Sequence, residues 1–229
     1  MNYTENEYEQ NPRIIDEEYR LRLQSFQVPA IRQHFGSLEK KVFADIGCGD
    51  IPLAYCQDQI GRPSIYYATD LSEKALNSGV ERLQEKGVNI DNIKTISGAY
   101  FDFSLIPDDT IEYAFSNSLF SHLSINTILI CLKNLRPKMR NNAKYLSSMI
   151  ILPEGLDVLE YEWKVKHGSI SHSAKDPFHY NFNEFKKIVE VSTDFECSSL
   201  YKYGHPFQVL IEFSTKKSSK KFIFWKRSS

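Results

Sequence analysis

The stretch VFADIGCGDIPLA, residues 42–54, decides the fold. It begins with a short apolar run, interrupted only by Asp45, that predicts a buried strand. Gly47 and Gly49 then predict a tight loop, and a helix is expected to follow over 52–60. A strand, a glycine-containing loop and a helix in this order typically bind a nucleotide-like ligand, because the first amide groups of the helix point at the loop.

Beyond this stretch, strands and helices alternate along the chain. The alternation predicts an α/β fold of the Rossmann-like, doubly wound type, with a mostly parallel sheet and ligands at the carboxyl ends of its strands. Two final strands, in ECSSLYKYG and PFQVLIEFS, are expected to complete a seven-stranded sheet whose last strand is antiparallel. The other predicted strands are 42–46, 64–70, 92–97, 111–116 and 144–152, and the other predicted helices are 16–36, 72–87, 124–136 and 183–191.

Three parts of the chain are expected to differ in organisation. Residues 1–40 are predicted to form an N-terminal extension with helices, and residues 41–215 the main domain. Within that domain, 153–180 shows little periodicity and is long for a connection, so we expect a lid or acceptor-binding loop there. Residues 216–229 form a basic and aromatic tail, with six Lys or Arg residues and no acid. Such a tail either contacts an anionic membrane surface or stays solvated, as charged termini usually do.

Composition and charge favour a globular, cytoplasmic protein. The chain has 229 residues and a formal net charge of −1, so no overall field favours nucleic acid, which is not expected as a partner. No apolar run reaches the ~18 residues of a membrane span, and the polar N-terminus does not resemble a signal peptide. The four cysteines contain no CxxC pair and are expected to be reduced thiols, and no residue spacing predicts a metal site.

The acids around the glycine loop indicate which ligand the loop binds. Asp70 ends the second strand, 21 residues after Gly49, where a carboxylate can accept hydrogen bonds from ribose hydroxyls. A dinucleotide is disfavoured, because Pro52 stands where its fingerprint has a third glycine and because Asp45 would repel a pyrophosphate. A ligand with a ribose and a cationic amino group fits better, and S-adenosylmethionine has both.

Three motifs in order resemble the class I S-adenosylmethionine-dependent methyltransferases over residues 42–152. DIGCG resembles the first motif of that family, ATDLSEKAL its second-strand motif with the ribose-binding acid, and IPDDTIEYAFSNSLFSHLS its stretch through the fourth strand into the next helix. The resemblance implies that 41–215 is a methyltransferase domain with S-adenosylmethionine as its cofactor. It implies cofactor contacts for Asp45, Gly47, Cys48, Gly49, Asp70, Leu71, Asp102, Phe103, Ser116 and Asn117.

One residue next to the loop departs from this family. Ile51 stands where the family often has a glycine. We expect either that its side chain narrows the methionine end of the site or that it marks a weak cofactor-binding protein.

Histidines supply the candidate catalytic groups. The family's amine methylators of nucleic acid carry Asn/Asp-Pro-Pro-aromatic after the fourth strand, whereas this chain has Ser-Asn-Ser-Leu at 116–119. Methylation of a hydroxyl is favoured instead. It needs a base that takes the hydroxyl proton, and histidine is suited to this near neutral pH. His122 follows the fourth strand, His179 ends the long loop, and His205 lies between the last two strands, and the sequence does not choose among them.

Three hypotheses about function follow from these residues. The first is metal-independent O-methylation of a hydroxyl on a glycan or glycolipid intermediate, by in-line methyl transfer with a histidine base. The second keeps the same core but takes a small metabolite or a protein side chain as the acceptor. The third is a degenerate, non-catalytic cofactor-binding module, for which Ile51 is the strongest argument. As an enzyme, the protein is expected to have a small-molecule or glycan acceptor as its partner.

Overall fold

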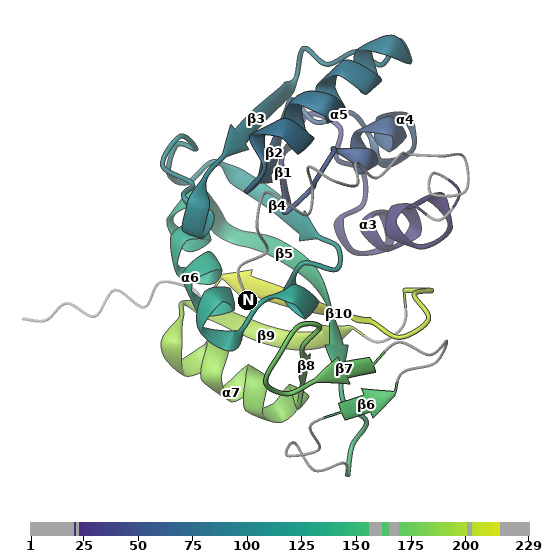
Figure 1. Cartoon of the computed structure of the whole chain (residues 1–229). Helices are drawn as coiled ribbons and strands as arrows, with labels where there is room; N and C mark the ends of the chain where they lie inside the picture. Colours follow the sequence, from purple (N-terminus) through teal and green to yellow (C-terminus); the bar gives the residue numbers. More distant parts are fainter. Residues whose placement is uncertain (1–20, 22, 156–161, 165–169, 201–202, 216–229) are drawn as a thin grey trace, which may run out of the picture.

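A central sheet runs through the computed structural model of the protein, with its main strands in the order β3-β2-β1-β4-β5-β10-β9 (Figure 1). β10 is antiparallel to β5 and β9, whereas the pairs from β3 to β5 are parallel. This confirms the predicted α/β, doubly wound, mostly parallel sheet with an antiparallel last strand. The strands span Val42–Ile46 (β1), Ile65–Asp70 (β2), Ile93–Ser97 (β3), Ile111–Ser116 (β4), Met139–Ile151 (β5), Phe195–Leu200 (β9) and Val209–Thr215 (β10).

The structure describes residues 21, 23–155, 162–164, 170–200 and 203–215. The predictions for the first 20 residues and for the basic and aromatic tail fall outside these ranges. Within them, no helix is both long and apolar enough to cross a membrane.

Helices cover both faces of the sheet (Figure 1). α3, α4 and α5 pack on one face, where Phe43 and Tyr66 belong to a buried apolar cluster, and α6 and α7 pack on the other, around Tyr145 and Phe213. The central strands are therefore apolar on both faces, as parallel strands between helices are. The helices span Val28–Phe35 (α3), Gln57–Ile60 (α4), Glu73–Glu85 (α5), Ile125–Leu135 (α6) and Phe182–Ser192 (α7), with short 3-10 or π turns at Leu23–Gln27 (η1), Pro52–Cys56 (η2), Ala99–Phe101 (η3), Phe120–His122 (η4) and Arg136–Lys138 (η5).

Polar side chains mark the starts of three helices. Ser72 begins α5, Ser124 begins α6 and Asn181 begins α7, and each side-chain oxygen accepts hydrogen bonds from amides two or three residues further on. These bonds satisfy amides that the first helical turn leaves unpaired, and each stabilises its helix by about 1 kcal/mol. Because α5 follows β2 and α6 follows β4, two of these caps lie just after the strand ends that carry the candidate site.

The helix predicted over 52–60 differs from the observed structure. Pro52–Cys56 forms a 3-10 turn and Gln57–Ile60 a single α-helical turn, because the backbone leaves helical geometry at Cys56, where φ is −104° and ψ is 16°. The glycine loop is therefore not followed by a long helix whose amide groups point at it.

Short strands occupy part of the segment 153–180, which the sequence analysis treats as a loop. Glu162–Lys164 (β6) and Ile170–His172 (β7) pair in an antiparallel manner, and His179–Tyr180 (β8) pairs in parallel with the end of β5. Strands of two or three residues are too short to show an alternating pattern, which explains why the sequence does not predict them.

Candidate functional site

The glycine loop is anchored to the end of β2. The amides of Gly47 and Cys48 both donate to the Thr69 carbonyl, at 2.8 and 3.0 Å. Gly47 has a φ of +65° and Gly49 a φ of +58°, a left-handed conformation that glycine adopts without strain. A Cβ atom at Gly47 would lie 2.7 Å from Leu119 Cδ1, so the loop that follows β4 closes directly on the glycine loop. The ends of β1, β2 and β4 thus meet at one place.

Asp70 lies beside this loop, as the sequence predicts. One carboxylate oxygen accepts a hydrogen bond from the Gly49 amide at 2.7 Å, and the other accepts one from the Ser72 amide at 2.9 Å. Burial raises the pKa of this carboxyl, and the backbone N–H groups that it accepts from partly offset the rise. A carboxylate has about four acceptor sites, more than the backbone amides of Gly49, Leu71 and Ser72 use, so Asp70 can hold the loop and still accept a hydrogen bond from a ribose hydroxyl.

Asp45 is buried beneath the loop. The Tyr66 hydroxyl on the neighbouring strand donates to its carboxylate at 2.6 Å. Burial raises the pKa of Asp45 to about 7; the Tyr66 hydrogen bond lowers it, and the nearby charge of Asp70 raises it further. Tyr66 is not among the site residues predicted from the sequence. A tyrosine in a strand that is expected to be buried is the signal that could have revealed it, because a buried hydroxyl needs a hydrogen-bond partner.

Ile51 points into the core rather than toward a ligand. It is 0% exposed and packs in the same apolar cluster as Leu53 and Leu76. Its φ of 57° is left-handed, which explains why a glycine would suit this position. The side chain offers no surface to a ligand, which argues against the expectation that it narrows the methionine end of the site.

Replacing Ile51 with glycine is expected to lower the free energy of unfolding by about 2 kcal/mol. Loss of the buried side chain costs roughly 2–5 kcal/mol, and relief of the left-handed backbone returns roughly 1–2 kcal/mol. Urea denaturation measures this change in the free energy of unfolding. The Leu53→Ala variant loses packing without relieving backbone strain, so it should be destabilised more than Ile51→Gly. The affinity for S-adenosylhomocysteine should stay within threefold, and a tenfold gain would show that Ile51 does obstruct the site.

Helix α5 packs against the same loop from outside. A Cβ atom at Gly79 would lie 2.4 Å from the Asp50 carbonyl oxygen, so only glycine allows this close approach. Arg82, one turn further along α5, forms an ion pair with the Asp50 carboxylate. These contacts fix the outer side of the glycine loop.

The end of β3 presents apolar surface beside Asp70. The Gly98 amide donates to the Asp70 carbonyl at 3.3 Å, which joins the ends of the two strands. Tyr100 is 79% exposed and Leu71 is exposed as well, a combination suited to a flat base such as adenine. Tyr100 and Phe101 both have left-handed backbones, and their carbonyls accept hydrogen bonds from the Asn134 side chain. Neither Tyr100 nor Asn134 is among the site residues predicted from the sequence.

The remaining predicted cofactor residues divide into accessible and buried ones. Asp102 is exposed, and its carboxylate accepts a hydrogen bond from the Ser104 amide at 2.8 Å, which lowers its pKa. Phe103 is buried in the core. Ser116 is also buried, with its hydroxyl bonded to the side chains of Tyr145 and Ser147.

Asn117 is partly exposed at the end of β4, next to a polar network. Its side-chain oxygen accepts a hydrogen bond from the Tyr203 hydroxyl at 3.1 Å. Ser118 and Ser148 both donate to the side-chain oxygen of Gln208, at 3.2 and 2.6 Å. This network ties the ends of β4 and β5 to the segment before β10.

His122 follows the segment that packs against the glycine loop. It ends η4, which starts directly after Leu119, the residue that packs against Gly47. Its Nδ1 atom lies 2.7 Å from a carboxylate oxygen of Asp176, and its side chain is 36% exposed. Asp176 is 54 residues away in the sequence, and no local pattern links the two.

The other two histidines are placed differently. His179 is 2% exposed in β8, with its Nδ1 atom 3.0 Å from the Ser171 hydroxyl. The Nδ1 atom of His205 accepts hydrogen bonds from the amides of Phe207 and Gln208, and burial lowers its pKa to about 4. His205 is therefore neutral at pH 7, and its Nδ1 lone pair is already used by the backbone.

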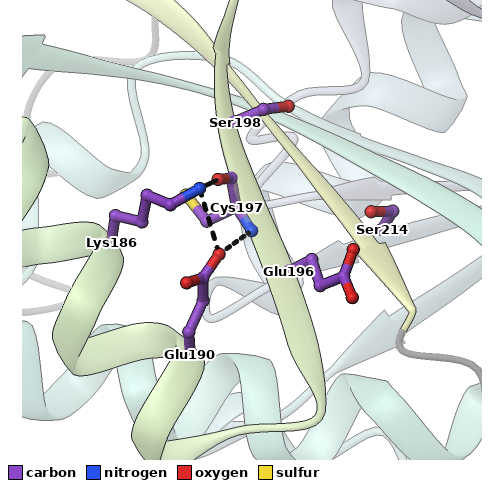
Figure 2. Close-up of a pocket in the computed structure, with 6 residues that line it drawn as sticks. All are labelled: Lys186, Glu190, Glu196, Cys197, Ser198 and Ser214. Atoms are coloured by element: carbon purple, nitrogen blue, oxygen red, sulfur yellow. Dashed lines mark hydrogen bonds and ion pairs between the residues drawn. The ribbon is translucent and has the colours of Figure 1, made fainter.

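A shallow hollow of about 450 Å³ lies elsewhere, between α7 and the edge strand β9 (Figure 2). The Lys186 ammonium donates to the Cys197 carbonyl at 2.6 Å, and the Glu190 carboxylate accepts from the Cys197 amide at 3.0 Å. β4, β5 and β10 separate β9 from the glycine loop. The hollow therefore lies away from the glycine loop, and its Lys186 and Glu190 side chains are already bonded to the backbone of β9.

In the parts of the chain that the structure describes, no three His, Cys, Asp or Glu side chains are grouped so that they could hold a metal ion.

No protein-family profile matches the sequence, and no curated protein matches it significantly.

Solved structures, in contrast, share the fold. An S-adenosylmethionine-dependent methyltransferase from Aquifex aeolicus aligns with a TM-score of 0.62 at 16% identity, over 93% of this chain and 98% of its own. The 1,6-didemethyltoxoflavin-N1-methyltransferase of Burkholderia thailandensis, solved with 1,6-didemethyltoxoflavin and S-adenosylhomocysteine, aligns with a TM-score of 0.62 at 13% identity, over 93% and 85%. The protein therefore has the fold of the class I S-adenosylmethionine-dependent methyltransferases.

Proposed function

We propose that the protein is an S-adenosylmethionine-dependent methyltransferase. The observation that carries the proposal is the contact between Asp70 and Gly49, which places a carboxylate with spare lone pairs at the glycine loop, between the ends of two parallel strands. This is where doubly wound sheets bind ribose-containing ligands. The Burkholderia thailandensis structure with S-adenosylhomocysteine supports the choice of cofactor, because its fold is the same.

The residues at the site fit this cofactor. Asp70 would accept hydrogen bonds from the ribose, and the backbone at Gly47 and Gly49 allows close approach. Leu71 and Tyr100 would contact the adenine through their exposed apolar surfaces. Asp45, beneath the loop, favours the positive charge of the methionine part. When bound, S-adenosylmethionine supplies an electrophilic methyl group.

The reaction proposed is metal-independent O-methylation with His122 as the base. His122 is partly exposed beside the loop that contacts Gly47, whereas His179 is buried and His205 has its Nδ1 lone pair occupied by amides. His122 would take the hydroxyl proton as the acceptor oxygen attacks. The protein's main contribution is to hold the oxygen in line with the methyl carbon and the sulfur.

The acceptor proposed is a hydroxyl of a glycan or glycolipid intermediate. Phe178 is partly exposed, and its amide donates to the Ser121 carbonyl at 2.6 Å, so an aromatic residue adjoins His122. Phe178 also stacks on Tyr180 with 6.4 Å between ring centroids. An aromatic ring beside the base can stack on the apolar face of a sugar. A small heterocyclic metabolite is the second candidate, because the Burkholderia thailandensis enzyme was solved with one.

Two experiments test the proposed function. Calorimetry should detect binding of S-adenosylhomocysteine to the full chain, and an absence of heat at high ligand concentration would refute the methyltransferase proposal. Mass spectrometry of glycans, lipids and small metabolites from cells with and without the gene should reveal one compound that loses a methyl group, which identifies the acceptor.

Replacing His122 with alanine is expected to lower turnover of that acceptor by roughly 100-fold or more, because the hydroxyl proton loses its base. The affinity for S-adenosylhomocysteine should stay within threefold. His34→Ala, on α3, serves as a control for the loss of a histidine and should retain turnover. Full turnover in the His122→Ala variant would show that another group removes the proton.

A further inference from the structure

Asp176 and His122 form a close pair that joins two distant parts of the chain. His122 ends η4, just after β4, and Asp176 lies between β7 and β8. The distance between His122 Nδ1 and Asp176 Oδ1 is 2.7 Å, and both side chains are partly exposed. The pair therefore lies at the surface of the candidate site rather than in the core.

The backbone around Asp176 is held on two sides. The Phe178 amide donates to the Ser121 carbonyl at 2.6 Å, and the His172 amide donates to the Pro177 carbonyl at 2.8 Å. The residues that follow Asp176 are thus attached to η4 through Ser121 and to β7 through His172. These bonds fix the position of the carboxylate relative to the imidazole ring, independently of the contact between the two side chains.

We propose that Asp176 is a positioning residue that sets the tautomer of His122 for proton abstraction. A carboxylate accepts hydrogen bonds but cannot donate them, so the ring must carry its proton on Nδ1 and its lone pair on Nε2. The acceptor O–H bond then breaks as its proton moves to Nε2. The oxygen would use the released electron pair to bond to the methyl group that S-adenosylmethionine supplies. The electron pair of the broken carbon–sulfur bond would stay on sulfur. The Asp176 carboxylate stabilises the imidazolium that results.

This inference rests on the proposed function, in which His122 is the base, and it assigns a role to the segment 170–180. That segment shows little periodicity in the sequence, yet it supplies half of the pair. The catalytic group on the methyltransferase core would therefore be incomplete without the segment that packs next to it.

Nuclear magnetic resonance of the full chain, with ¹⁵N-labelled histidine, tests the assignment without acceptor or cofactor. Two-bond correlations distinguish a ring protonated at Nδ1 from one protonated at Nε2, and the spectrum of a His122→Gln variant identifies the signals of His122. At about pH 8, His122 should carry its proton on Nδ1 and its lone pair on Nε2. Protonation mainly at Nε2 would overturn the proposal.

The Asp176→Asn variant should move His122 toward protonation at Nε2, because an amide can donate to Nδ1 as well as accept from it. Asp176→Glu should preserve the wild-type tautomer, and Asp194→Asn, on the exposed turn after α7, should change nothing. An unchanged tautomer in Asp176→Asn would overturn the proposal. If the Asp176→Asn variant does not fold, the tautomer of His122 is compared between wild type and Asp176→Glu. Loss of the Nδ1 proton in Asp176→Glu would also contradict the proposal.

Turnover provides a second readout once the acceptor is identified. Asp176→Asn should lower turnover by about tenfold or more, with the affinity for S-adenosylhomocysteine within threefold of wild type. Failure to bind S-adenosylhomocysteine would refute the proposed function, whereas a normal affinity with an unchanged tautomer would refute only the role of Asp176. The two failures are therefore distinguishable.

Discussion

Replacing Asp70 with alanine is expected to lower the affinity for S-adenosylhomocysteine by at least about 100-fold. A hydrogen bond to a charged group contributes roughly 1.5–3 kcal/mol, and the Asp70 carboxylate would accept at least one from the ribose. The variant also removes the acceptor of the Gly49 amide, which lies 2.7 Å from Asp70 in the wild type. The glycine loop would then lose its connection to the end of β2, which weakens binding further.

Calorimetry with matched variants separates these two contributions. Asp70→Asn keeps an oxygen that can accept from the Gly49 amide, so it should bind better than Asp70→Ala and worse than wild type. Asp91→Ala removes an exposed acid at the start of β3, at the opposite end of the strands, and should leave affinity unchanged. An Asp70→Ala variant whose affinity stays within threefold of wild type would refute the role of Asp70 in ribose binding.

Replacing Asp45 with asparagine is expected to stabilise the protein at pH 8. The folded protein raises the pKa of Asp45 from an ordinary value of 3.8 to about 7, mainly by burial. The folded state therefore binds the proton more tightly than the unfolded chain does. The contribution of Asp45 to stability is full below about pH 4, falls as the pH rises, and is lost above about pH 7. The change is on the order of 4 kcal/mol.

Asparagine has no charge at any pH but can still accept the hydrogen bond from the Tyr66 hydroxyl. The free energy of unfolding of Asp45→Asn, measured in urea without cofactor, should therefore fall less between pH 5 and pH 8 than that of wild type. At pH 8 the variant should be more stable by a few kcal/mol. Asp58→Asn, on the exposed side of α4, should keep the wild-type dependence. The same slope in Asp45→Asn and wild type would contradict the raised pKa.

Local patterns in the sequence predicted the parts of the site that depend on short-range geometry. Gly47 and Gly49 adopt left-handed backbones because a sharp turn follows β1, and such turns are visible as glycine spacing. Asp70 follows from the distance along the chain between two adjacent parallel strands. The mostly parallel sheet follows from the alternation of strands and helices, and the antiparallel β10 follows from the two closing strands.

Long-range contacts are what the sequence could not predict. The Tyr66 hydroxyl reaches Asp45 across neighbouring strands, and Asp176 reaches His122 across 54 residues. No spacing rule specifies such contacts, because they depend on strand register and on how the segment 170–180 packs. The direction of the Ile51 side chain is unpredictable for the same reason, since a left-handed backbone turns it into the core.

The side chains of α7 have a consequence for the solution behaviour of the protein. An edge strand normally presents unpaired N–H and C=O groups to which a strand of another molecule can attach. At Cys197 both groups are already bonded, to Glu190 and to Lys186 (Figure 2), and the Phe195 amide donates to the Thr193 hydroxyl. These bonds occupy backbone groups that a neighbouring strand would otherwise bind. The side chains of α7 therefore protect this stretch of β9 from strand addition and from the aggregation that begins at open sheet edges.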